Sequence, residues 1–169
     1  MDSMNKNNKT YIWIAVGCLG LLVCILAVIV FGFGGLMWIG AQTPENAAVQ
    51  VNAPINVKVN ESIEISVTIT NTGAETMKLA SIDLSLNYLN GFIVKQASPP
   101  FTETYQYTVP VSGEKVQTFV FDQSIAPGDT LVVVFNGESV LSGDFSGDVY
   151  VCVDSGFNCA VITTRTVVK

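Results

Sequence analysis

The pattern of hydrophobic positions divides the chain into two parts. Residues 11–41 form one apolar run without a charged side chain, whereas apolar and polar residues alternate in much of the chain after residue 47. A run longer than about 18 apolar residues is typical of a membrane-spanning helix. Alternation at every second residue is typical of strands that bury one face. The pattern therefore predicts one transmembrane helix followed by a domain of strands.

The ends of the apolar run predict the domain organisation and its orientation. We expect a polar head at residues 1–10, a transmembrane helix acting as a signal anchor at 11–41, a linker at 42–47 and a strand domain at 48–169. Lys6 and Lys9 lie just before the run, and the first charge after it is Glu45. Lysines in short loops stay on the cytoplasmic side. We therefore expect a single-pass protein of the cell membrane, with a cytoplasmic N-terminus and an extracytoplasmic C-terminal domain.

Processing of the N-terminal run is an alternative to a retained anchor. A cleaved secretory signal has an apolar region of about 7–15 residues, and this run is much longer, although Ile39-Gly40-Ala41 resembles a cleavage site. Lipoprotein processing at Cys18 would leave a second long apolar stretch at residues 19–39. A pilin leader has a basic residue and Gly or Ala directly before the apolar run, unlike Lys9-Thr10-Tyr11. Retention is our expectation, and cleavage stays an alternative.

Small residues recur within the apolar run. Gly17, Gly20, Cys24 and Ala27 follow one another at steps of three, four and three residues. On a helix this spacing places them along one face, where a second helix can approach closely. Membrane-spanning helices are also rich in Gly and Ala where no second helix packs against them. The face is therefore a candidate for packing against a partner helix or a second copy.

Short strands separated by turn residues fill the rest of the chain. The clearest is 62–70, where Ile63, Ile65 and Val67 alternate with polar residues. Further strands are expected at residues 77–86, 91–97, 105–109, 117–121, 130–135, 149–153 and 160–168. Leu79 breaks the alternation of its strand, which indicates a bulge.

Two segments carry more specific expectations. Residues 130–135 are apolar without alternation, which predicts a strand covered on both faces. Residues 142–148 are rich in Gly, Asp and Ser, which predicts a loop. No helical period appears after the linker. About seven to nine short strands predict an all-β ectodomain, an immunoglobulin-like antiparallel β-sandwich.

Two of the four cysteines lie in the strand domain. Cys152 and Cys159 bracket residues 153–158, whose Asp, Ser, Gly and Asn suit a hairpin connection. The flanking strands would bring the two sulfur atoms together, and outside the cytoplasm such a pair oxidises. Two unlinked thiols are the alternative. We expect a structural disulfide between Cys152 and Cys159.

Composition excludes several classes of chemistry. The chain has no histidine, which removes the usual catalytic base and the histidine ligands of zinc and copper. We expect no catalytic residues, no cofactor and no enzymatic activity. The net charge is -6 and nothing basic is clustered, so no nucleic-acid partner is expected. Asp144, Asp148 and Asp154 lie in or near turn-rich segments and are candidate ligands for calcium, although Asp in turns more often binds the local backbone.

A family resemblance rests on two segments of the domain. Residues 59–73, VNESIEISVTITNTG, resemble the opening strands of CARDB-type domains, which are extracellular sandwiches of bacteria and archaea. Residues 125–130, IAPGDT, are similar to the turn before a later strand of that class. The resemblance implies an immunoglobulin-like surface module and carries over no functional residue.

Together these features predict a membrane-anchored, outward-facing module with a non-enzymatic interaction, adhesion or accessory role. Its partners would be the lipid bilayer, through residues 11–41, and an unidentified protein. The alternative is a subunit of a larger membrane complex or pilus-like filament, assembled through the N-terminal helix. A carbohydrate- or calcium-binding module is a third interpretation.

Overall fold

A computed structural model describes residues 24–25, 44–110 and 112–169. The chain divides between residues 41 and 42 into two compact units, and every strand of the described residues belongs to the second. Residues 24–25 are helical. The expected transmembrane helix otherwise lies outside the described residues. Within the part of the chain that is described, no helix is both long and apolar enough to cross a bilayer.

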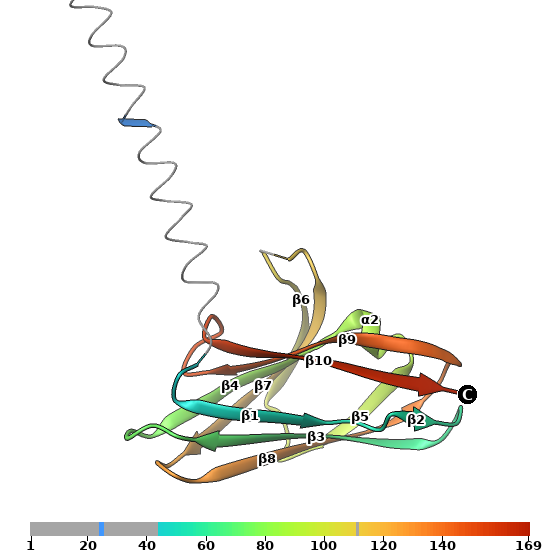
Figure 1. The fold of residues 1–169 in the computed structure, drawn as a ribbon, viewed down its shortest axis with the longest axis horizontal. Coiled ribbons are helices and arrows are strands. Elements are labelled where there is room, and N and C mark those ends of the chain that lie inside the picture. The colour runs from blue at the N-terminus through green and yellow to red at the C-terminus, as the bar shows by residue number, and fades with distance from the viewer. Residues whose placement is uncertain (1–23, 26–43, 111) are drawn as a thin grey trace, which may run out of the picture. The chain divides into compact units, whose positions relative to one another are not determined.

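Two sheets pack face to face and form an all-β sandwich (Figure 1). The smaller sheet contains, in spatial order, β1 (Ala47–Asn52), β3 (Ser62–Asn71), β8 (Thr130–Ser139) and β5 (Phe92–Ser98). The larger sheet contains β2 (Asn56–Val57), β10 (Cys159–Val168), β9 (Gly143–Val153), β4 (Met77–Ser85), β7 (Lys115–Ile125) and β6 (Glu103–Thr108). One helical turn, α2 (Leu86–Leu89), follows β4. The predicted all-β sandwich is therefore confirmed.

The core lies between the sheets and results from the alternation of the strands. In β3, Ile63, Ile65, Val67 and Ile69 are buried, whereas the polar residues between them are exposed or half-buried. Full burial of such a side chain contributes about 1.5–3 kcal/mol. The predicted bulge is also present, because the register of β4 shifts between Leu79 and Ser81 against both of its neighbours.

The helical turn α2 closes one end of the core and was not predicted. Ser85 caps it by accepting a hydrogen bond from the backbone of Asn87. Tyr88 is fully buried, and its hydroxyl bonds that of Thr166 over 2.9 Å. Gly147 allows this close packing, because a Cβ atom there would lie 2.5 Å from the Cβ of Ser85. Four residues are too few to show a helical period in a sequence.

The expected loop at residues 142–148 is wrong. Strand β9 begins at Gly143, and its polar residues pair with β10 throughout, with Asp144 opposite Val167 and Asp148 opposite Thr163. Hydrogen bonds from β10 side chains satisfy both carboxylates. Residues that favour turns in isolation therefore form a strand here, because the neighbouring strand supplies their polar partners.

Strand β8 is not covered on both faces, contrary to the sequence-based expectation. Val133 and Phe135 are buried, but Val132 is 45% exposed and Val134 is half-buried. The outer face of the smaller sheet is open to solvent, and an apolar run alone does not reveal that. Two further expectations need correction. The described residues hold ten strands rather than seven to nine, and β2 pairs with β10 in parallel.

Candidate functional site

Four strands of the larger sheet contribute one row of side chains. Tyr105 of β6 lies opposite Thr118 of β7, and Thr118 lies opposite Asp83 of β4. Asp83 in turn lies opposite Tyr150 of β9. Directly opposed residues in a sheet project to the same face, and so does Tyr107, two positions from Tyr105. We call the surface formed by these five residues the tyrosine face.

The tyrosine face is the outer surface of its sheet. Ile82 and Phe119, the neighbours of this row along their strands, belong to the hydrophobic core and project inward. Thr118 is nevertheless only 3% exposed, so adjoining side chains cover it from outside. Tyr105 and Tyr107 are 46% and 42% exposed. Tyrosine offers apolar area together with a polar tip, and it is enriched at protein interfaces.

The centre of the tyrosine face holds unsatisfied polar atoms. Neither Asp83 Oδ1 nor Thr118 Oγ1, both buried, has a partner at hydrogen-bond geometry. Burial raises the pKa of the Asp83 carboxyl, and the nearby hydroxyls of Ser81 and Thr118 counter this rise in part. A buried polar atom without a partner costs free energy. Both atoms are shielded from solvent, so a bound group could reach them only after the covering side chains move.

Tyr150 is fixed at one end of the row. Its hydroxyl donates a hydrogen bond of 2.6 Å to Glu114 Oε2, in the turn before β7. Burial and this bond to a carboxylate raise the pKa of Tyr150 to about 12. The phenol therefore stays protonated at neutral pH and cannot serve as a base there.

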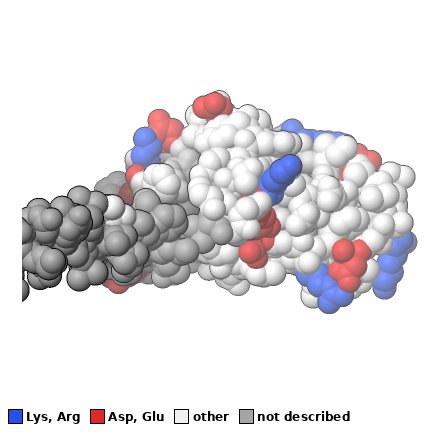
Figure 2. Space-filling model, turned by 90° about the horizontal axis from the view of Figure 1, so that it is seen from above, with Lys and Arg blue, Asp and Glu red and all other residues white. Residues whose placement is uncertain are grey.

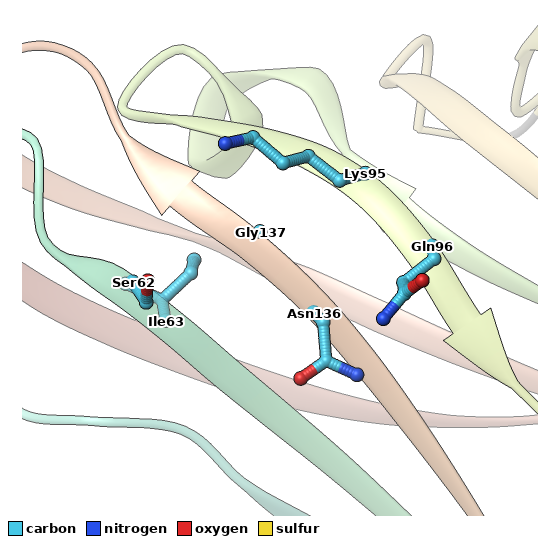
Figure 3. A pocket seen from close by; sticks show the side chains of 6 residues that line it. All are labelled: Ser62, Ile63, Lys95, Gln96, Asn136 and Gly137. Atoms are coloured by element: carbon cyan, nitrogen blue, oxygen red, sulfur yellow. The ribbon is translucent and has the colours of Figure 1, made fainter.

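The outer face of the smaller sheet carries a different surface. Its hollow, of about 300 Å³, is lined by Ser62, Ile63, Lys95, Gln96, Asn136 and Gly137 (Figure 3). Lys95 forms an ion pair with Glu138. Gly137 sits against β5, where a Cβ atom would lie 2.4 Å from the carbonyl oxygen of Ile93. A second hollow, of about 360 Å³, lies beside β2 and the start of β3. The first hollow has one titratable side chain in its lining, Lys95, and the second has two, Glu61 and Glu64.

Charged side chains are scattered over the surface. In Figure 2, acidic and basic groups occur singly or in small groups of mixed sign, with broad uncharged areas between them. The described residues contain three ion pairs, Lys78–Asp122, Lys95–Glu138 and Arg165–Asp144, and Glu138 is the one partner that is not largely exposed. Exposed pairs of this kind contribute little to stability. No continuous basic area is visible on the face shown.

The predicted disulfide is confirmed. Cys152 and Cys159 stand directly opposite each other in the β9–β10 ladder, with their Cα atoms 4.0 Å apart, and a disulfide joins them. The hairpin that it closes also contacts β4, since Lys78 N donates to Asp154 Oδ1 and Asp154 N donates to Lys78 O. Of the candidate helix-packing face, Gly17, Gly20 and Ala27 lie outside the described residues. Cys24 is helical, and it is a free, exposed cysteine.

The candidate calcium ligands are not brought together. Asp144 binds Arg165, which lowers the pKa of that carboxyl, and Asp148 accepts a hydrogen bond from Thr163. Asp154 Oδ1 accepts a hydrogen bond from the backbone N–H of Lys78. Across residues 44–110 and 112–169, no three acidic or cysteine side chains are grouped as metal ligands would be.

The tyrosine face was not predicted from the sequence. Its one local signal is the alternation of Tyr105 and Tyr107 in the segment ETYQYT, which places both rings on one side of a strand. Thr118, Asp83 and Tyr150 are distant in the sequence. Only the strand order of the sheet brings them beside the β6 tyrosines.

No family model matches the chain, and no curated protein does. Among solved structures, a CARDB domain from Pyrococcus furiosus in complex with di-metal ions is 18% identical, with a TM-score of 0.43 over 78% of this chain and 96% of that one. A cohesin module from a Clostridium perfringens family 33 glycoside hydrolase is 12% identical, with a TM-score of 0.43 over 73% and 96% of the two chains.

A third similar structure is the CBM3a-L domain of a Clostridium thermocellum cellulosome scaffoldin. It is 14% identical, with a TM-score of 0.38 over 58% of this chain and 71% of that one. The resemblance to CARDB-type sandwiches noted in the sequence therefore recurs in three dimensions. With TM-scores below 0.5, none of these likenesses carries a functional argument.

Proposed function

We propose that this chain is a membrane-anchored, outward-facing, immunoglobulin-like module that binds a partner through the tyrosine face and catalyses no reaction. The observation that carries the proposal is the row Tyr105–Thr118–Asp83–Tyr150. It combines exposed aromatic rings with a sheltered carboxyl oxygen that lacks a hydrogen-bond partner. A partner that covers the rings would use the first feature, and it would use the second by donating a hydrogen bond to Asp83 once the side chains that cover this oxygen move aside.

Two observations support an extracytoplasmic location. The apolar run of residues 11–41, with Lys6 and Lys9 just before it, fits a signal anchor with its head in the cytoplasm. The disulfide between Cys152 and Cys159 fits an oxidising compartment. A domain on this anchor would present the tyrosine face outside the membrane.

Other observations support a non-enzymatic role. Histidine is absent from all 169 residues. Tyr150, on the tyrosine face, has a pKa of about 12 and is hydrogen-bonded to a carboxylate, so it is not poised for proton transfer at neutral pH. Asp83 lies among hydroxyls and rings, without a second titratable group directly opposite it that ionises near neutral pH. Binding therefore fits this surface better than catalysis.

A second candidate function is that of a subunit in a larger membrane assembly. Strand β6 favours it, because it is the last strand of the larger sheet and all six of its residues are exposed. An open strand edge can pair with another strand.

Site-specific photo-crosslinking in native membranes tests the proposed surface. A photoreactive residue replaces Tyr105, and in a matched control it replaces Val132, which is almost equally exposed at 45% but lies on the outer face of the other sheet. We expect adducts from position 105 and few from position 132. Equal yields at the two positions, or none at position 105, would contradict the proposal.

A further inference from the structure

Strand β6 is the least protected edge of the sandwich. Among the four edge strands of the described chain, β5 carries a register shift at Lys95 and is followed by Pro99 and Pro100, and β2 has only two residues. Strand β1 is as long as β6 and also lacks lysine and proline, but every second residue of β1 is half-buried, whereas all six residues of β6 are exposed. Short edges, bulges, lysines and prolines are the features that keep edges from pairing. Strand β6 has six residues, Glu103–Thr108, without lysine, proline or an internal register shift. In Figure 1 it lies at the margin of the larger sheet.

The direction of its backbone groups is set by the ladder with β7. Val109 N donates to Glu114 O over 2.8 Å, in register with the β6–β7 pairs. In an antiparallel ladder, hydrogen-bonded and non-hydrogen-bonded pairs alternate. Tyr107 and Tyr105 therefore direct their N–H and C=O groups toward β7. Thr108, Gln106 and Thr104 direct theirs to the free edge.

The sequence of this edge is a palindrome. Residues 104–108 read Thr-Tyr-Gln-Tyr-Thr, which is symmetric about Gln106. Two such strands that pair antiparallel across a two-fold axis at Gln106 would place Gln106 opposite Gln106, Tyr105 opposite Tyr107 and Thr104 opposite Thr108. Aromatic and threonine cross-strand pairs of this kind are favourable. The symmetry centre is also a residue whose backbone groups face the free edge, as a hydrogen-bonded central pair requires.

We infer that β6 pairs with β6 of a second copy of this chain, so that two larger sheets join into one continuous sheet. The free-edge groups of Thr104, Gln106 and Thr108 would form about six hydrogen bonds between the copies. The tyrosines of both copies would lie together on one face, with each Tyr105 beside the Tyr107 of the other copy. This isologous contact is self-complementary, as a two-fold dimer demands.

The charges near the edge are compatible with this pairing. Glu103 is the only charged residue of β6, and the two-fold axis places it opposite Val109 rather than opposite a second Glu103. The Thr104 hydroxyl donates to Thr118 O at 2.8 Å and accepts from Gln117 Nε2 at 2.6 Å. These bonds hold the side chain of Thr104 against β7 and leave its backbone groups at the free edge.

Cysteine crosslinking of the full chain in detergent tests the register. In a background in which Cys18 and Cys24 are serine, Gln106→Cys places two thiols in a hydrogen-bonded pair with Cα atoms about 5.5 Å apart, within the range of a disulfide. Gln50→Cys, on the exposed edge strand β1, is the matched control. We expect rapid disulfide-linked dimers from position 106 only. Equal rates at the two positions would overturn the inference.

A charge swap at the two-fold axis tests the contact without a covalent bond. Gln106→Lys and Gln106→Glu each place like charges opposite one another, whereas a mixture of the two variants places opposite charges there. In sedimentation of the full chain, we expect each variant alone to associate about tenfold more weakly than the mixture, and Gln106→Ala to associate like the unchanged protein. Association that is unaffected by the swap, as expected if only the N-terminal helices pair, would overturn the inference.

A second copy of the chain is one partner for the interaction role proposed above. The inference rests on that role only for the location of the domain outside the membrane. The two fail separately. Crosslinks from position 105 to a different protein, with no dimer at position 106, would leave the tyrosine face as a binding surface and remove the second copy. Dimers at position 106 in a domain that is not displayed outside the membrane would keep the second copy as a partner and remove the outward-facing role.

Discussion

The Tyr150 hydroxyl donates a 2.6 Å hydrogen bond to Glu114 and thereby connects β9 to the turn before β7. Strand β4 lies between these two strands in the sheet, so the bond spans three neighbouring strands on the outer surface. It fixes the ring of Tyr150 beside the sheltered centre of the tyrosine face. The two groups lie 36 residues apart in the chain.

This hydrogen bond predicts a loss of stability at high pH. The pKa of Tyr150 is about 12 in the folded protein, against about 10 in an unfolded chain. The folded state therefore retains the proton between these values, and its stability falls as pH rises from about 10 to 12. Tyr150→Phe should lower stability at neutral pH by about 1 kcal/mol and flatten this part of the pH profile. Urea denaturation followed by circular dichroism at pH 8 to 12 measures both effects, and parallel profiles for the two proteins would contradict the assignment.

For the half-buried carboxyl of Asp83, we predict that a substitution stabilises the protein. Its pKa is raised by burial above 3.8, so ionisation costs stability as pH rises through the raised value and leaves the folded protein weaker at pH 7. Asp83→Asn removes the charge and keeps the shape. We expect a higher melting temperature than that of the unchanged protein at pH 7, and equal temperatures at pH 3.

An exposed carboxylate supplies the control for this comparison. Asp129 lies in the turn before β8 and is exposed, so Asp129→Asn should change the melting temperature little at either pH. A lower melting temperature for Asp83→Asn at pH 7 would contradict this prediction. It would mean that hydrogen bonds to the ionised Asp83 outweigh the cost of its burial.

Removal of the disulfide should destabilise the domain without abolishing its fold. The bond between Cys152 and Cys159 closes a short loop, for which the chain-entropy model gives about 2–3 kcal/mol. We expect this loss for the double variant Cys152→Ser/Cys159→Ser in urea denaturation. Cys18→Ser/Cys24→Ser changes the same number of thiols outside the domain and should leave its stability unchanged. A loss below about 0.5 kcal/mol in the first variant would contradict the structural role.

Asn71 predicts a larger loss from a single polar side chain. It is fully buried, its amide nitrogen donates to the carbonyls of Glu75 and Ile125 at 2.8 Å, and its Oδ1 accepts from Gly73 N at 2.9 Å. Asn71→Ala leaves these backbone groups without partners, which should cost about 3 kcal/mol. Asn136→Ala, at the half-buried rim of the hollow in Figure 3, should cost less than about 0.5 kcal/mol. Similar losses for the two variants would contradict this account of Asn71.

The alternation of apolar and polar residues correctly predicted the strands that keep one face against the core along their whole length. The alternation in β3 identifies its buried face because one sheet packs on one core, and the break at Leu79 identifies a bulge because the inward face must be kept. The Cys152–Cys159 pair was predictable because only six residues, 153–158, lie between the two cysteines across a hairpin.

Contacts between distant strands were beyond the reach of these patterns. Gly143 to Asp148 form a strand because β10 supplies Arg165 and Thr163 as partners, which the segment itself does not encode. The tyrosine face depends on the order β6–β7–β4–β9. A sequence reveals the two tyrosines of β6 but not that Asp83 lies in the same row.

The location of the domain is the property on which the proposed role depends most. A single cysteine at Ala74, in the exposed turn after β3, or at Asn7, in the head, is introduced into a background in which Cys18 and Cys24 are serine. Intact cells that express the full chain are treated with a membrane-impermeant maleimide. We expect labelling of Ala74→Cys on intact cells, and of Asn7→Cys only after the membrane is opened. Labelling of Asn7→Cys on intact cells while Ala74→Cys stays protected would contradict an outward-facing domain.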